Sequence, residues 1–143
     1  MGAVRHICLS VWLVLVAGCG ASDEAADLES LVDGQSLMGT AGRLTGSFLM
    51  DEPHKGVDNP LAIELKDEGQ ALADAEVLVS PWMPAHAHGS RDQQAQGDDD
   101  GMYHVDELSF PMAGYWELRV EVSLQGELVD QFVVPVVVAE TND

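Results

Sequence analysis

The residues best suited to chemistry lie in the segment Pro81–Gly89, whose sequence is PWMPAHAHG. Met83, His86 and His88 place one thioether and two imidazoles within six residues. Copper(I) prefers such donors to carboxylates. Prolines and a glycine restrict or reverse the backbone around them. The spacing therefore indicates either a soft-metal site or a structural turn that happens to carry exposed histidines.

The rest of the domain shows the periodicity of strands rather than helices. From Gly39 onward, apolar side chains recur at every second position, and glycines and prolines interrupt the pattern roughly every ten residues, as in a β-sandwich. Strands are predicted at 44–50, 61–65, 77–79, 102–106, 115–124 and 128–138. Gln125 and Gly126 predict a hairpin turn. Pro135 cannot donate to a ladder, so the last strand is predicted to lie at an edge or to contain a bulge. The predicted fold is an all-β, immunoglobulin-like β-sandwich of about seven strands.

Between the histidine segment and the strand at 102–106 lies a polar stretch, 89–101, with the sequence GSRDQQAQGDDDG. It contains no aliphatic residue larger than alanine, which predicts a loop or a disordered tip. The aspartates at 98–100 are contiguous, whereas an EF-hand loop places its ligands at alternate positions. A solvated turn is therefore favoured over a calcium site.

The N-terminus has the features of an export signal. Ile7–Ala17 is an apolar run that is too short to span a bilayer stably. It leads to the sequence VAGC, and small residues before Cys19 are typical of bacterial lipoprotein processing, in which the cysteine is acylated. The alternative is an ordinary signal peptide that is cleaved nearby. Gly20, rather than an aspartate, is similar to the residue found after the cysteine in outer-membrane sorting.

These signals divide the chain into a lipoprotein signal peptide at 1–18, an acidic tether at 19–38 and one domain at 39–143. Cys8 would be removed with the signal and Cys19 would carry lipid, so no thiol is left for a disulfide or a thiolate metal site. The chain has 25 Asp and Glu against 6 Lys and Arg, for a formal net charge of −19. Nucleic acid is therefore excluded as a partner, since phosphate binding needs a basic face.

Several motifs follow one another in a recognisable order. An A-x-V-x-V strand leads to a Met-Pro corner ending in His-Gly, then to a Gly-x-Tyr strand and a Met-x-Gly-x-Trp-Glu-Leu strand. The residues concerned are Ala75, Val77, Val79, Met83, Pro84, His88, Gly89, Gly101, Tyr103, Met112, Gly114, Trp116, Glu117 and Leu118. This order resembles the YtkA-like domain, which is related to the FixH-like proteins of bacterial envelopes. The resemblance implies the sandwich fold and an accessory role in copper handling or oxidase assembly.

One position departs from the family pattern. Where the family often has a second methionine in the corner, as MPxM, this chain has His86. An imidazole in place of a thioether admits copper(II) beside copper(I).

Alternate loops of such a sandwich gather at one end. Met112, in the turn before Trp116, is therefore predicted to meet the histidine corner. We predict a copper site formed by Met83, His86, His88 and Met112, because copper(I) is satisfied by two to four soft or imidazole donors. The alternative is that the methionines pack in the core, since methionine fills irregular gaps well.

The remaining histidines are weaker candidates. Met102 and His104 share one face of a predicted strand and form a second Met/His pair. His104 stands among acidic residues, which favours a solvated side chain. His54 is a lone loop histidine, and no role is predicted for it.

The combined prediction is a lipid-anchored protein of the bacterial cell envelope that faces the periplasm, with the outer membrane favoured over the inner. It would contact the membrane through its lipid and serve an envelope protein partner. The alternative is a lipoprotein interaction module without metal, which docks through its acidic surface or an exposed sheet edge. The sequence has no Ser-His-acid arrangement, phosphate loop or HExxH pair, so no enzymatic activity is expected.

Overall fold

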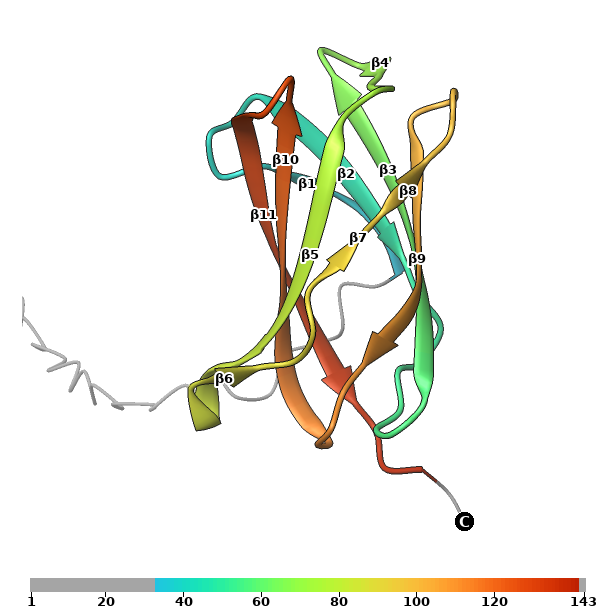
Figure 1. The fold of residues 1–143 in the computed structure, drawn as a ribbon, viewed down its shortest axis with the longest axis vertical. Helices are drawn as coiled ribbons and strands as arrows, with labels where there is room; N and C mark the ends of the chain where they lie inside the picture. The colour runs from blue at the N-terminus through green and yellow to red at the C-terminus, as the bar shows by residue number, and fades with distance from the viewer. Residues whose placement is uncertain (1–32, 142–143) are drawn as a thin grey trace, which may run out of the picture.

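The computed structural model describes residues 33–141, which form two antiparallel sheets packed face to face (Figure 1). The first sheet has the order β1 (Asp33–Met38), β2 (Leu44–Leu49), β3 (Asp58–Asp67), β9 (Met102–Ser109) and β8 (Gln96–Gly97), with β4 (Gln70–Ala71) paired to β3. The second has the order β11 (Glu127–Val138), β10 (Gly114–Leu124), β5 (Glu76–Met83) and β6 (His88–Gly89), with β7 (Gln93–Gln94) paired to β5. A short 3₁₀ turn, η1 (Pro84–His86), joins β5 to β6. The predicted all-β sandwich is confirmed.

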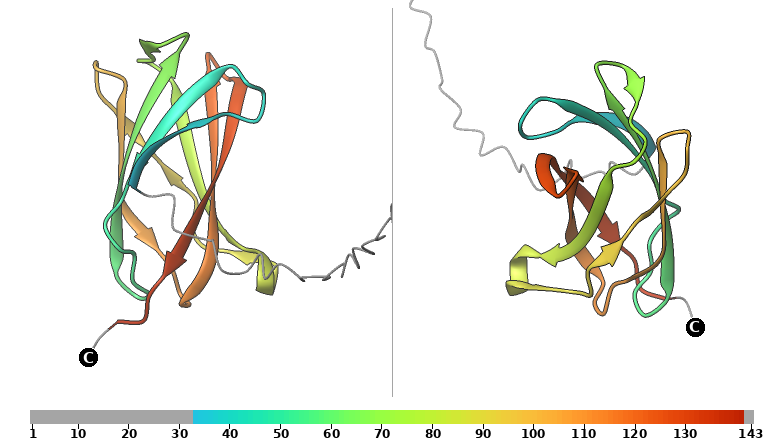
Figure 2. Two further views of the ribbon diagram at one scale, coloured as in Figure 1. Left: turned by 180° about the vertical axis from the view of Figure 1, so that it is seen from behind. Right: turned by 45° about the horizontal axis from the view of Figure 1, so that its top comes forward.

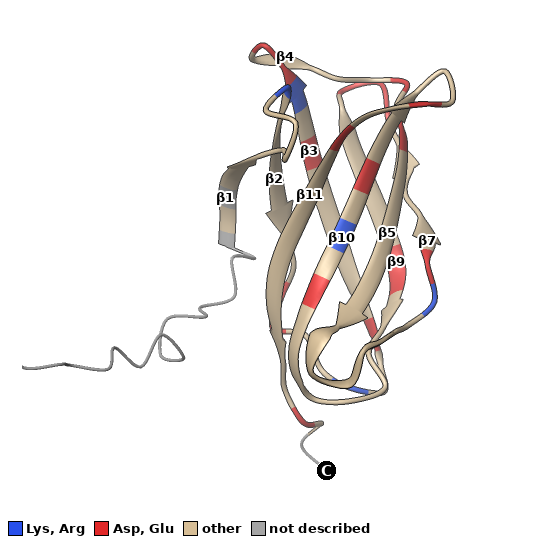
Figure 3. Cartoon of the chain, turned by 90° about the vertical axis from the view of Figure 1, so that its left-hand side faces the viewer, with Lys and Arg blue, Asp and Glu red and all other residues tan. Residues whose placement is uncertain are grey.

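The longer strands follow the predicted periodicity. In β10, Trp116, Leu118, Val120 and Val122 are buried, while their neighbours face outward. Gln125 and Gly126 have φ angles of 53° and 78°, as a tight hairpin turn requires. The predicted edge is also confirmed, because β11 is the border strand of its sheet (Figure 3). Within residues 33–141, no helix has the length and apolar character needed to cross a membrane.

The folded domain begins earlier than the predicted boundary at residue 39. Asp33–Met38 forms β1, in which Ser36 and Leu37 pair with Ser47 and Gly46 of β2. These residues were assigned to the acidic tether because the stretch before the domain is acidic, small and poor in aromatics. Pairing at a sheet edge uses backbone groups and does not require an apolar alternation. The predicted signal peptide, Cys19 and the earlier part of the tether lie outside the described residues.

The polar stretch at 89–101 was predicted as a loop or disordered tip; most of it is loop, but three short strands, which the prediction missed, include five of its residues. Its short strands connect the two sheets: β6 and β7 pair with β5, whereas β8 pairs with β9 (Figure 2). Ala95, at the crossing, is buried and donates its N–H to the Val77 carbonyl at 2.8 Å. Where the chain crosses between the sheets it buries only the small side chain of Ala95, so the sequence there shows no alternation of apolar and polar residues. Residues 98–100 do form an exposed turn.

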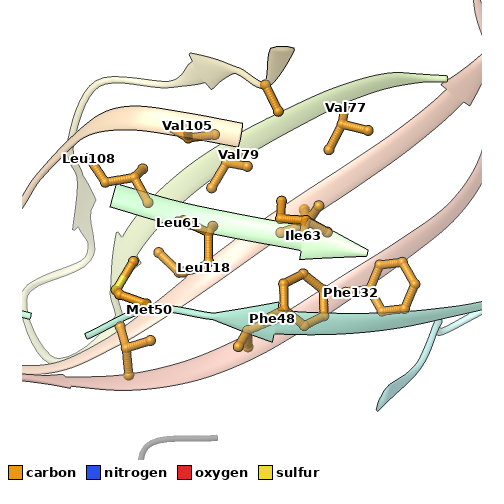
Figure 4. Close-up of a cluster of buried hydrophobic side chains, with 14 of the residues drawn as sticks. Phe48, Met50, Leu61, Ile63, Val77, Val79, Val105, Leu108, Leu118 and Phe132 are labelled. Atoms are coloured by element: carbon orange, nitrogen blue, oxygen red, sulfur yellow. The ribbon is translucent and has the colours of Figure 1, made fainter. Parts of the chain in front are cut away.

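The core lies between the two sheets and draws side chains from both (Figure 4). Phe48 of β2 and Phe132 of β11 meet edge to face, with ring centroids 5.4 Å apart. Leu61 and Ile63 of β3 lie on the inner face of the first sheet, in the same cluster. Aromatic pairs of this kind add about 1 kcal/mol beyond the burial of their area.

A buried carboxylate closes the end of the sandwich at the β1–β2 turn. Asp130 is only 2% exposed. Its oxygens accept four backbone N–H groups at 2.8 to 3.0 Å, from Ala41, Arg43, Leu44 and Gln131. Burial opposes ionisation of this group, but the four donors outweigh burial and hold the pKa of Asp130 below its ordinary value of 3.8.

Asp130→Asn is expected to lower the free energy of unfolding by about 3 kcal/mol at pH 7, because the amide cannot accept all four bonds. Because the pKa of Asp130 is lower in the folded than in the unfolded state, its carboxylate stabilises the fold at pH values above the unfolded-state pKa. This stabilisation is lost as the pH falls through the folded-state pKa. The difference between wild type and variant should therefore narrow below about pH 4. Urea denaturation from pH 7 to pH 3 measures it.

Asp106→Asn is the matched control, because Asp106 is exposed on β9. It should change stability by less than about 0.5 kcal/mol at any pH. A stability difference for Asp130→Asn that stays constant with pH would contradict the role of its ionised carboxylate.

Candidate metal centre

The histidine corner forms because β5 turns back on itself at Met83. The chain reverses through η1, Ala87 adopts a left-handed conformation with φ 52°, and its N–H bonds to the Pro84 carbonyl at 3.3 Å. In β6, His88 then pairs directly opposite Met83. Directly opposed residues of an antiparallel pair project from the same face. The thioether of Met83 and the imidazole of His88 therefore lie on the same face of this sheet.

The two imidazoles of the corner lie close together. His86, in η1, is exposed, and its ring centroid is 5.8 Å from that of the half-buried His88. An imidazole nitrogen binds a metal at about 2.0 Å, which places the ring centroid about 3 Å from the metal. Two rings on one metal thus have centroids at most about 6 Å apart. The observed separation falls within this limit.

The second turn, between β9 and β10, carries Met112. Its carbonyl oxygen accepts the indole N–H of Trp116 at 2.9 Å, while the residue itself is 38% exposed. Trp116 is completely buried and packs edge to face on Phe110, with ring centroids 5.4 Å apart. The turn is thereby fixed to the core at both its beginning and its end.

Both turns lie at the lower end of the sandwich in Figure 1, and each contacts β10 at Trp116 or Gly114. The His88 ring stands at 73° to the Trp116 indole, with centroids 5.8 Å apart. The methyl carbon of Met83 lies 3.2 Å from where a Cβ on Gly114 would stand. Gly114 also has a φ of 122°, a conformation that side chains disfavour. A glycine at this position therefore leaves room for the Met83 side chain.

The four predicted donors differ in their burial. Met83 is 4% exposed and belongs to the core, as the packing alternative expected, yet it also pairs with His88. His86 and Met112 are exposed. Within residues 33–141, no three side chains of His, Cys, Asp and Glu gather as a metal site. The imidazoles and methionines at this end of the sandwich come from two turns, which are both in contact with Trp116.

The remaining candidates lie apart from this cluster or are engaged otherwise. His104 stands exposed on β9 with its Nε2 4.0 Å from a carboxylate oxygen of Asp98, as expected for a solvated histidine. The Nδ1 of His54 lies 2.8 Å from the Glu52 carbonyl oxygen. Trp82 points to the outer face, where Arg119 covers its ring at 4.7 Å.

Sequence reasoning missed two residues that shape this end of the molecule. Trp116 was given no part in the predicted site, but it bonds to the Met112 turn and contacts His88. Gly114 makes room for Met83. The available signal was the Met-x-Gly-x-Trp spacing, which places both residues directly after Met112.

Comparison with models of known protein families gives a match. A family model described as YtkA-like matches residues 45–121, which extend from β2 into β10 and include both turns. No curated protein and no solved structure matches the chain. Because the matched segment covers more than half of the 143 residues, the chain belongs to the YtkA-like family.

Proposed function

We propose that this protein is a lipid-anchored envelope protein that binds one copper ion at the end of its sandwich. Met83, His86, His88 and Met112 would hold the ion. The observation that supports the proposal is that Trp116 contacts both turns: its ring lies against His88, which pairs with Met83, and its N–H bonds to the Met112 carbonyl.

The donor chemistry supports copper over other metals. Thioethers are soft ligands that select copper(I), and imidazoles accept copper in either oxidation state. Zinc sites are usually built from cysteine, histidine and carboxylates, whereas this cluster supplies methionine and histidine. The copper would be cargo rather than a catalytic centre, consistent with a role in copper handling or oxidase assembly.

The burial of the donors suggests how cargo would move. Met83 and His88 are held by strand pairing and core packing. His86 and Met112 lie at the surface, where another protein's ligands could replace them one at a time. A fixed inner pair with an exposed outer pair suits transfer better than permanent storage. Cys19, if acylated, would keep the domain near membrane-bound partners.

Copper(I) titration against a competing chelator tests the proposal. Residues 20–143, which contain the whole sandwich, are expected to bind one copper(I) with a Kd below micromolar. His86→Ala with His88→Ala should weaken binding at least about 100-fold, or about 1.4 kcal/mol for each factor of ten. Met112→Leu should weaken it at least about tenfold.

Matched variants away from the cluster serve as controls. His104→Ala removes another exposed histidine, and Met38→Leu replaces another exposed methionine. Both should leave the affinity unchanged. A wild-type Kd weaker than micromolar, or equal effects of His86→Ala and His104→Ala, would remove the proposal.

Trp116→Phe tests whether the indole positions the site. The substitution keeps an aromatic ring in the core but removes the N–H donor to the Met112 carbonyl. The free energy of unfolding should fall by about 1 to 2 kcal/mol. Copper(I) affinity should fall about tenfold, because the Met112 turn is released.

Trp82→Phe is the control for Trp116→Phe, because Trp82 lies on the outer face. It should leave the affinity within about twofold of wild type. Retention of full affinity by folded Trp116→Phe protein would show that the indole bond does not position the site.

A further inference from the structure

The free edge of β11 is bounded at both ends by hydrogen bonds. Near its start, Thr40 donates its N–H to the Gln131 carbonyl at 2.7 Å. Just beyond its end, Ala139 donates its N–H to the Pro53 carbonyl at 2.7 Å and accepts the Lys55 N–H at 3.0 Å. Gln131 and Ala139 therefore direct their bonding groups away from β10, toward the open side of the sheet.

Between these two points the edge is open. Backbone groups alternate in direction along a strand, so Val133, Pro135 and Val137 direct theirs to the same side as Gln131 and Ala139. Within residues 33–141, no hydrogen bond reaches that side from 133 to 137. Because proline lacks an N–H, this window offers two donors and three acceptors. It has the length of a short added strand.

The side chains beside the window form an apolar strip. Val133 and Val137 are 48% and 42% exposed, and Pro135 lies half-buried between them. An exposed, apolar edge strand is a template for pairing with another chain unless it is protected. Charged residues and prolines commonly protect such edges. Residues 131–139 of β11 and its extension contain one proline, Pro135, and no charged residue.

Acidic residues flank the strip on the neighbouring strand. Glu117 of β10 stands opposite Pro135, and Glu121 stands opposite Gln131 (Figure 3). Glu117 is already paired with Arg119, whose guanidinium lies 3.1 Å from its carboxylate oxygen. Glu121 is exposed and has no ion pair among the described residues.

A shallow groove of about 440 Å³ separates the acidic residues from the apolar strip. It is lined by Glu117, Arg119, Val120, Glu121, Gln131, Phe132 and Val133. Arg119 stands directly opposite Val133, but its guanidinium is paired with Glu117. A long basic side chain that lays its methylene stem on Val133 would reach Glu121 diagonally, one pair further along β10. The groove therefore fits lysine or arginine better than an acidic or short polar side chain.

We propose that residues 133–137 of β11 receive an extended segment of a basic partner protein as an added strand. The segment alternates basic residues, which lie over Val133 and Val137, with apolar residues that face the sandwich core. Backbone bonds to the open window supply affinity, and Glu121 with the formal charge of −19 selects basic sequences. This inference does not depend on copper binding.

A second copy of this chain is a poorer occupant. Antiparallel pairing of two such windows would place Pro135 opposite Pro135, which leaves both proline carbonyls without a donor. It would also bring together two chains that each carry a formal charge of −19. A basic segment with an N–H opposite Pro135 satisfies the window and reduces the charge.

The test uses a capped seven-residue peptide of alternating lysine and valine, titrated into residues 20–143 with a copper chelator present. Nuclear magnetic resonance should show saturable binding, and the amides of Val133 and Val137 should exchange at least tenfold more slowly. With the added strand antiparallel to β11, the lysines stand opposite Val133, Pro135 and Val137, so the lysine amides face β11. N-methylation of the lysine amides should weaken binding at least tenfold, whereas N-methylation of the valine amides should not.

Protein variants separate strand addition from general charge attraction. Val133→Lys with Val137→Lys should weaken peptide binding at least tenfold without unfolding the domain, because both side chains are exposed. Leu128→Lys adds the same kind of charge at a 50% exposed position on β11 outside the window. It should change binding by less than threefold.

Equal binding of the two N-methylated peptides, or equal effects of the window variant and Leu128→Lys, would overturn the proposal. Sedimentation of the protein alone should show a monomer. The proposal would also be overturned if the protein alone formed a dimer in which the Val133 and Val137 amides were already protected from exchange. That result would show that the edge pairs with a second copy of the chain.

Discussion

Trp116 joins the two turns on which the candidate centre depends. Its N–H holds the Met112 carbonyl, its ring meets His88, and the same ring rests on Phe110 in the core. Because Trp116 is completely buried, its position is set by the packing of the two sheets. The relative placement of the donors is therefore a property of the core, although the donors themselves belong to turns.

The pairing of β5 with β6 adds a second constraint. It sets His88 opposite Met83 through the backbone, so this inner pair does not rely on flexible side chains finding each other. Gly114 permits the arrangement by leaving space for the Met83 methyl group. The outer donors, His86 and Met112, are attached to the same framework but remain exposed. Rigid inner positions and accessible outer ones can thus coexist within a few residues.

The sequence predicted the parts of the fold that have a hydrophobic period. Strands such as β10 and β11 were recognised because alternate residues enter the core. β1 and the crossing at Ala95 were not, because both are held mainly by backbone pairing. Such pairing depends on neighbours that are distant in sequence. The polar composition of these segments therefore gave no local indication of it.

The candidate site was predictable in composition but not in geometry. Met83, His86 and His88 are adjacent in sequence, and the loop arrangement of a sandwich suggested that Met112 would be near. The contact between His88 and Trp116 and the bond from Trp116 to Met112 arise only once the sheets are packed. Residue types therefore indicated which donors to consider, and tertiary structure determined that both turns contact Trp116.

The most direct measurement is X-ray absorption at the copper edge of the copper(I)-loaded protein. If the two turns present their donors to one ion, its first shell contains both sulfur and imidazole nitrogen, and the sulfur signal diminishes in Met83→Leu with Met112→Leu. A shell of nitrogen and oxygen alone, or a shell unaffected by those substitutions, would contradict a site shared by the two turns.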